Sequence, residues 1–498
     1  MRIEPVEPQP QRLQENPLYT WAGFSSHLLY RLMPVRFPGH TKQELTRLLK
    51  IALPLIAAFL SEYLMFVATK MVVGQLGYLE LAAVGISGDL TFEVLVILIG
   101  LLSIVGVLCA QAEGLGEKKQ AGLAVRQGFI ISTVVGIPAM AIVWNMDIVL
   151  VWTSQDPRVI ELARPFLYCI TPSVLAVLYF SVLRSFVAAL SRPKAVMYIT
   201  VAAVPMNYLL ALLLVNGGWG IPALGIAGAG LAMTIASWTM FILLLMHVYI
   251  TDDLRGYGIF ASRWKIDLAI CREIMVLGIP VAGLLIFEAS LFTVVSVLAG
   301  IINAETLAAY QITVAWFGIP LVVAIGIAEA TMVRVAQGVG QGDWRKARNS
   351  GMFGIACGVL LLAMMIVFPV GLTDTIISVF ISEEDPGFTT VSALATNFLF
   401  IAALFQVFDG LQAIAARALR GLKDSLVPLW IAGFGYWVMG IGGGILLAFV
   451  ANMQGIGLMW GLAMGLFSTG VLLAVRFYRL TAYRIIRQLR QAERKNSE

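Results

Sequence analysis

Long apolar stretches alternate with short polar segments along this chain from about residue 51 onward. A transmembrane helix needs about 20 mainly apolar residues to cross about 30 Å of hydrocarbon. Twelve stretches are long enough, and we place their starts near Ile51, Ala83, Val125, Val159, Ala195, Gly225, Ile274, Leu307, Gly351, Ser392, Val427 and Gly455. The pattern therefore predicts an all-α polytopic membrane protein with twelve transmembrane helices.

The composition agrees with a membrane protein. The chain has 498 residues, of which 59% are hydrophobic and 13% charged, and its mean hydropathy is +0.87. So little polar surface cannot enclose soluble domains, and the lipid bilayer is the expected environment. The net charge of +5 comes from short segments between apolar runs, so we expect no nucleic-acid partner. The four cysteines have no spacing that suggests zinc or a disulfide.

Lysine and arginine indicate how the chain is oriented, because they stay on the cytoplasmic side of short loops. The basic loops are predicted to carry Lys118 and Lys119, then Arg184, Arg192 and Lys194, then Arg255, Arg263 and Lys265, then Arg345, Lys346 and Arg348, and finally Arg417, Arg420 and Lys423. The loops between them carry almost none, and Arg158 is the clear exception. We therefore predict that both termini are cytoplasmic.

The two halves of the chain repeat each other at a constant offset. Adding 226 to a residue number carries Pro54 to Pro280, Glu62 to Glu288, Ala110-Gln111 to Ala336-Gln337, and Gly114 and Gly116 to Gly340 and Gly342. Such self-similarity predicts two homologous six-helix lobes. Since six is even, both lobes have the same orientation and are related by a pseudo-two-fold axis along the membrane normal.

This repeat sets the predicted domain boundaries. They are an N-terminal cytoplasmic segment (1–46), an N-terminal lobe (47–250), a polar linker (251–270), a C-terminal lobe (271–478) and a cytoplasmic tail (479–498). Residues 1–14 lack the apolar core of a signal peptide. Residues Leu18–Phe37 mix aromatics and leucines with arginines, which fits either an interfacial helix or a flexible tail.

Two acids stand alone in long apolar stretches of the second lobe. Glu288 is the only charged residue in 274–304, and Asp409 is the only one in 386–416. An ionised carboxylate in hydrocarbon is costly, so such residues usually face a bundle interior and mark an ion or substrate path. Two carboxylates in one lobe can bind a sodium ion or share a proton. We predict a cation-coupling site; the alternative is that neighbouring hydroxyls and amides satisfy each acid structurally.

The first lobe has charges of its own within the predicted spans. Glu62 is the repeat mate of Glu288 and is either a vestige or part of a second relay with Asp89 and Glu93. Asp89 and Glu93 lie one helical turn apart and share a face. Two interpretations stay open for these acids: an ion pair that neutralises Lys70, and a functional proton site.

Other features lie near the predicted cytoplasmic ends of the spans. Gly114-Leu115-Gly116 and Gly340-Gln341-Gly342 precede basic residues, and flexible glycines there suit tight turns. Glu329 has Arg334 five residues further on, so we interpret it as a side chain that reaches the membrane interface.

Aromatic residues of the second lobe are candidates to line an apolar cavity, although lipid-facing or packed rings are the commoner case. They are Phe287, Phe292, Trp316, Phe405, Phe408, Tyr436 and Trp437.

Together these residues resemble the multidrug and toxic compound extrusion (MATE) family of secondary transporters, over about Leu45 to Leu480. The resemblance rests on the Ala-Gln-x-x-Gly-x-Gly motif at 110–116 and again at 336–342, on Arg420-Gly421-Leu422-Lys423-Asp424, and on Asn207 with the glycines of 217–230. The sequences around Glu288 and Asp409 resemble the NorM-like branch of the family.

The resemblance implies an efflux transporter of the bacterial inner membrane that exports organic, cationic and amphipathic compounds in antiport with sodium ions or protons. It implies a monomer, no other cofactor, and a cation site at Glu288 and Asp409. It also implies that Gln311, Asn207, Tyr310, Phe287 and Phe405 line the substrate cavity. The chain departs from the family where Ala68 replaces a common aspartate and Phe405 a common tyrosine.

Two other functions would each require features beyond paired apolar lobes. A flippase for lipid-linked oligosaccharides shares the paired lobes, but it would need a basic cavity, and the predicted spans offer little beyond Lys70. A membrane-embedded acyl- or phosphotransferase would need a cluster of histidines and acids at one membrane face, and the sequence has no such cluster. We therefore predict that the protein is not an enzyme.

Overall fold

A computed structural model describes residues 41–497, apart from 154, 219, 221, 261–264 and 381–387. The segment Leu18–Phe37 lies outside the described residues. The elements of the first half are α2 (Thr41–Gly74), α3 (Tyr78–Leu115), α4 (Lys118–Trp144), α5 (Met146–Trp152), α6 (Pro157–Ile170), α7 (Ser173–Ala189), α8 (Lys194–Asn216), α9 (Ile226–Ile250) and α10 (Asp252–Arg255). Those of the second half are α11 (Leu268–Ile302), α12 (Ala304–Gly340), α13 (Trp344–Met365), α14 (Val367–Gly371), α15 (Thr373–Phe380), α16 (Phe388–Gly421), α17 (Leu426–Gly433), the π-helix η1 (Phe434–Gly442), α18 (Gly443–Ile445), the π-helix η2 (Leu446–Val450) and α19 (Gln454–Ser497).

The number of membrane spans agrees with the prediction. Among the described residues, 11 helical segments are long and apolar enough to cross a membrane. The pair α6 and α7, bent by 47°, makes a twelfth. The break falls at Thr171 and Pro172, where proline cannot donate a helical hydrogen bond. The predicted all-helical polytopic fold is confirmed.

Several spans are much longer than a bilayer requires. Helices α2, α3, α11, α12 and α16 have 34, 38, 35, 37 and 34 residues, whereas about 20 suffice. The prediction that Arg184, Arg417 and Arg420 lie in loops is therefore wrong. Helix α7 continues to Ala189 and α16 to Gly421, because carboxylates inside the bundle pair with Arg184 and Arg417 and allow these charges to lie within helices.

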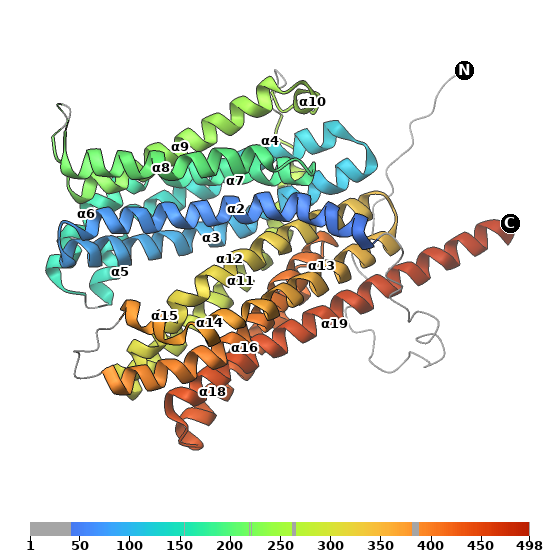
Figure 1. Cartoon of the computed structure of the whole chain (residues 1–498). Coiled ribbons are helices and arrows are strands. Elements are labelled where there is room, and N and C mark those ends of the chain that lie inside the picture. Colours follow the sequence, from blue (N-terminus) through green and yellow to red (C-terminus); the bar gives the residue numbers. More distant parts are fainter. Residues whose placement is uncertain are drawn as a thin grey trace. The chain divides into compact units, whose positions relative to one another are not determined.

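The helices form two groups that follow the repeat. In Figure 1, α2 to α9 (blue to green) gather on one side and α11 to α19 (yellow to red) on the other. Helices α3 and α12 start 226 residues apart (304 − 78), and so do α4 and α13 (344 − 118). We call the first group the N-lobe and the second the C-lobe. The end of the bundle that carries the turns between α3 and α4 and between α12 and α13 is called the basic end.

The two lobes meet through α2 and α3 on one side and α11 and α12 on the other. Glycines bring these helices close together, as is common where membrane helices pack. A methyl group added at Gly278 of α11 would lie 2.6 Å from the Leu101 carbonyl oxygen of α3. One added at Gly326 of α12 would lie 3.0 Å from the Ile56 nitrogen of α2. The lobes therefore touch at backbone level.

The orientation of the basic end can be tested by cysteine labelling. We expect a membrane-impermeant maleimide to label Asn303→Cys and Asp374→Cys in intact cells, because these exposed residues lie at the end opposite the basic loops. Lys119→Cys and Lys265→Cys should react only after permeabilisation. Labelling in the reverse pattern would place the basic end outside the cell.

Candidate functional site

The two solitary acids of the C-lobe come together in the structure. Glu288 lies on α11 and Asp409 on α16, and the side-chain amide of Gln412 bridges them. Its Nε2 donates to Glu288 Oε1 at 3.2 Å and to Asp409 Oδ1 at 3.3 Å. Asp409 is 1% exposed, whereas Glu288 is only partly buried. A single amide group thus holds two carboxylates from different helices at one point.

Helix geometry explains why Gln412 reaches both acids. It follows Asp409 by three residues, so both side chains project from one face of α16 toward α11. The α16 backbone comes close to its neighbours here, since a methyl group added at Gly410 would meet the side chain of Leu362 on α13. Sequence reasoning did not identify Gln412, although the three-residue spacing was a usable signal.

Two buried oxygens near the acids have no hydrogen-bond partner in the described structure. They are Gln412 Oε1 and the hydroxyl of Tyr436. Tyr436 is fully buried and interacts electrostatically with both Glu288 and Asp409. It lies on η1, and π-helical segments often occur at functional sites. Because unpaired buried polar atoms are costly, these oxygens need an explanation beyond packing.

Positive charges flank the acid pair toward the basic end of α16. Arg417 donates to Glu329 at 2.9 Å, and both Arg417 and Arg420 interact electrostatically with Glu288. Glu93 of the N-lobe also acts on Glu288. The prediction that Glu329 reaches the membrane interface beside Arg334 is wrong. Its carboxylate pairs with Arg417 inside the C-lobe, since α16 extends far enough to deliver that arginine.

The corresponding position of the N-lobe has a different partner. Glu62 accepts a hydrogen bond from Arg184 at 2.6 Å, and the guanidinium of Arg184 also lies 4.6 Å from the centre of the Phe59 ring. The Arg184 side chain is only 7% exposed. Its repeat mate is residue 410 (184 + 226), directly after Asp409. Next to the position that corresponds to Asp409, the N-lobe therefore has a fixed cation.

Asp89 and Glu93, the other acids of the suggested second relay, lie on α3. Asp89 pairs with Lys70 at 2.9 Å, and the Asp89 side chain is 65% exposed. The sequence interpretation of an ion pair that neutralises Lys70 is therefore confirmed. Lys70 also lies 4.6 Å from the centre of the Phe66 ring. Glu93 is exposed and interacts electrostatically with Asp89 as well as with Glu288. A relay through Glu62, Asp89 and Glu93 stays a prediction.

The residues expected to line a substrate cavity divide into two groups. Gln311 is exposed and donates to Ser296 Oγ at 3.2 Å, and Phe287 is half-buried against Trp437. Asn207, Tyr310 and Phe405 are buried between helices in this conformation, so their place in a substrate cavity stays a prediction.

Hydrogen bonds to neighbouring helices hold two of these buried side chains, Asn207 and Tyr310. Asn207 of α8 donates to the Met65 carbonyl at 3.2 Å and to Thr69 Oγ1 at 3.0 Å, both on α2. The hydroxyl of Tyr310 donates to the carbonyl of Phe292 at 2.9 Å.

A known protein family matches this chain in two segments, one in each lobe. The MatE family model matches residues 54–213 and again residues 280–446, so the two matches begin 226 residues apart (280 − 54). A probable multidrug resistance protein NorM of Mesorhizobium japonicum is 34% identical over 440 residues, which are 88% of this chain and 94% of that protein. One of the same name in Pseudomonas aeruginosa is 32% identical over 439 residues, 88% of this chain and 90% of the relative.

Solved structures share the fold. The crystal structure of the eukaryotic MATE transporter AtDTX14 matches with a TM-score of 0.79 at 23% identity, covering 89% of this chain and 99% of that one. An outward-facing multidrug resistance MATE family transporter of the MOP superfamily matches with a TM-score of 0.79 at 16% identity, covering 88% and 96%. The chain thus has the fold of these membrane transporters. The chain belongs to the MatE family, and the predicted resemblance is confirmed.

Proposed function

We propose that this transporter exports organic, cationic and amphipathic compounds in exchange for sodium ions bound at Glu288 and Asp409. The observation that carries the proposal is the pair of carboxylates held by Gln412 inside an apolar helix bundle. The names of the relatives support multidrug efflux, and their bacterial origin supports the inner membrane as the location. The distribution of lysine and arginine supports cytoplasmic termini.

Sodium is favoured over a proton by the oxygens around the acids. A shared proton needs only the two carboxylates, whereas a hard cation seeks several oxygen ligands. Gln412 Oε1 and the Tyr436 hydroxyl are buried oxygens without partners close to the acids. Rotation of the Gln412 amide would replace its NH₂ donor with its oxygen, so that it could act as a ligand to sodium.

Ion binding can drive export only if the ion has unequal affinity for the two states of the transporter. Glu288 and Asp409 lie on different helices, so a relative movement of α11 and α16 changes the distance between the carboxylates. Sodium would hold the carboxylates together, and its release would leave two negative charges to separate or to attract a cationic substrate. A substrate would approach the pair of acids from the side of Glu288, because this residue is partly exposed.

Transport in liposomes tests this function. The full-length protein is reconstituted with a fluorescent organic cation, and either a sodium gradient or a proton gradient is imposed. We expect the sodium gradient to drive movement of the cation and the proton gradient to have little effect. Transport driven by protons alone would overturn the assignment of sodium. Transport driven by neither, across a panel of cations, would overturn efflux coupled to these ions; movement of a lipid-linked oligosaccharide under the same conditions would favour the flippase alternative.

A further inference from the structure

The two copies of the Ala-Gln-x-x-Gly-x-Gly motif contact each other across the lobes. A methyl group added at Gly114 of α3 would meet the backbone oxygen of Gln337 and lie 3.1 Å from the Cα of Gly340, both on α12. One added at Gly340 would meet the backbone oxygen of Gln111. These glycines are therefore required for close approach of the two backbones, beyond the tight turns predicted from the sequence.

The contacts are reciprocal. Gln111 and Gln337 are 226 residues apart, and so are Gly114 and Gly340. Gly114 approaches Gln337, and Gly340 approaches Gln111, so exchanging the lobes exchanges one contact for the other. Reciprocity of this kind is the property of a two-fold interface. The motif copies therefore meet close to the pseudo-two-fold axis inferred from the repeat.

Each glutamine of the motif also reaches the end of a helix in the opposite lobe. Gln111 Nε2 donates at 3.1 Å to the carbonyl of Gly421, the last residue of α16. Gln337 Nε2 donates at 2.8 Å to the carbonyl of Ala189, the last residue of α7, and at 3.1 Å to Ser191 Oγ. The last carbonyls of a helix have no partner within that helix. Each glutamine therefore donates to a helix-end carbonyl of the opposite lobe.

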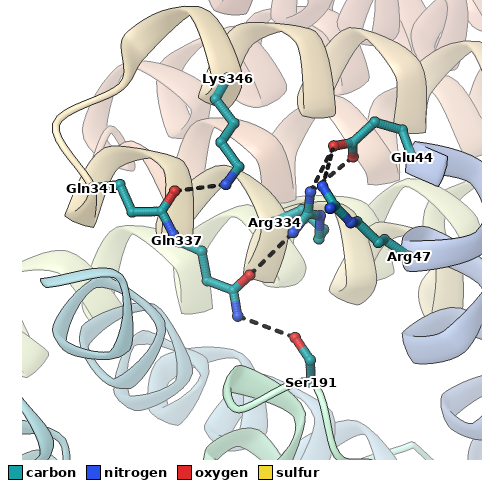
Figure 2. Close-up of polar contacts among 7 residues, drawn as sticks. All are labelled: Glu44, Arg47, Ser191, Arg334, Gln337, Gln341 and Lys346. Atoms are coloured by element: carbon teal, nitrogen blue, oxygen red, sulfur yellow. Dashed lines mark hydrogen bonds and ion pairs between the residues drawn. The ribbon is translucent and has the colours of Figure 1, made fainter. Parts of the chain in front are cut away.

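Charged groups reinforce these contacts at the same end of the bundle. Arg334 of α12 donates to both oxygens of Glu44 on α2, at 2.9 and 2.8 Å, and also to Gln337 Oε1. Figure 2 shows this arrangement, with Gln337 lying between Arg334 and Ser191. Arg420 at the end of α16 donates to Ser103 Oγ of α3 at 2.8 Å. Polar groups from both lobes are thus joined at the basic end.

We propose that the repeated motif forms a gate between the lobes at the basic end, closed in the structure described here. A transporter that alternates between two faces must separate its lobes at this end in one of its states, and that separation breaks the glutamine bonds and the glycine contacts together. This inference rests on the chain being a two-lobed transporter and not on which ion it couples. Because the contacts form as a set, the gate has two discrete arrangements rather than a continuous range.

Spin-label distances in lipid nanodiscs test the gate. Labels are placed at Lys119→Cys and Arg345→Cys, exposed residues 226 positions apart, after replacement of the four native cysteines. In Gly114→Ala, the added methyl group should force α3 and α12 apart and populate a longer distance. The matched control is Gly85→Ala on the same helix, where an added methyl group has nothing within 4 Å. We expect the control to keep the distance distribution of the parent.

A second variant removes hydrogen bonds without adding bulk. Gln111→Ala with Gln337→Ala should raise the ratio of long to short distances about tenfold, because the three hydrogen bonds that the two amides donate are lost. If this variant is monodisperse and folded but keeps the parental distances, the gate proposal is wrong. The measurement uses no ion gradient, so its outcome is independent of the sodium assignment at Glu288 and Asp409.

Discussion

Glu288→Gln and Asp409→Asn are each expected to abolish ion-driven efflux while the protein still folds. The amides keep the shape of the acids and most of their hydrogen-bonding capacity, but they remove the charge that binds a cation. We expect gradient-driven efflux per folded molecule to fall by more than about tenfold, which corresponds to about 1.4 kcal/mol of lost differential ion affinity.

The control for this prediction is Asp374→Asn, which removes an exposed acid of the same lobe in α15. It should transport like the parent. If the acids are only structural, the amide variants will instead be less stable, and whatever protein folds will respond normally to the gradient. Normal coupling in both Glu288→Gln and Asp409→Asn would contradict the proposed site.

Glu62→Gln is expected to act mainly on stability, in contrast to the same change at its repeat mate Glu288. It would leave the Arg184 guanidinium buried without its carboxylate. Removing one partner of a buried ion pair lowers the free energy of unfolding by about 3 to 5 kcal/mol. We expect a loss of about 3 kcal/mol here, because Glu62 is partly exposed. The measurement is thermal or denaturant unfolding in detergent, with Glu288→Gln as the comparison.

The double variant Glu62→Gln/Arg184→Met tests the reason for that loss. Replacing both partners of a buried pair with uncharged groups is often neutral, so the double variant should recover most of the lost stability. A Glu62→Gln variant as stable as the parent, or a double variant no better than the single one, would show that the pair contributes little.

Much of the fold could be predicted from hydropathy and the repeat. The twelve spans follow from length alone, and the offset of 226 reappears in helix starts and in the two matches of the family model. What hydropathy could not supply was the position of the arginines. A hydropathy pattern predicts that a span ends at the first basic residue. Arg184 and Arg417 nevertheless lie inside helices, because acids distant in sequence pair with them.

The candidate site was only partly predictable. Glu288 and Asp409 were identified because isolated charges in apolar stretches are rare, and nothing else in the sequence was needed. Gln412 and the hydroxyl of Tyr436 are polar groups of ordinary types, and their importance depends on which helices pack together. For the same reason the sequence did not show that the side chain of Asn207 joins α8 to α2 inside the N-lobe.

The two lobes share a scaffold but differ in the partner of the acid that they have in common, Glu62 in one and Glu288 in the other. In the N-lobe, Glu62 has a permanent cation in Arg184, which is part of the chain and cannot leave. In the C-lobe, the neighbouring helix supplies Asp409 instead, so the pair with Glu288 can be neutralised by an ion from solution. This difference explains why we place ion exchange in only one of two homologous lobes.

Sodium counterflow tests this account most directly. Full-length protein is reconstituted in liposomes loaded with radioactive sodium, and an organic cation is supplied on the opposite side without any imposed potential. We expect uptake of the organic cation to release the sodium in the parent and in Asp374→Asn, and not in Asp409→Asn. Equal release of sodium by Asp409→Asn and the parent would contradict the claim that Glu288 and Asp409 couple transport.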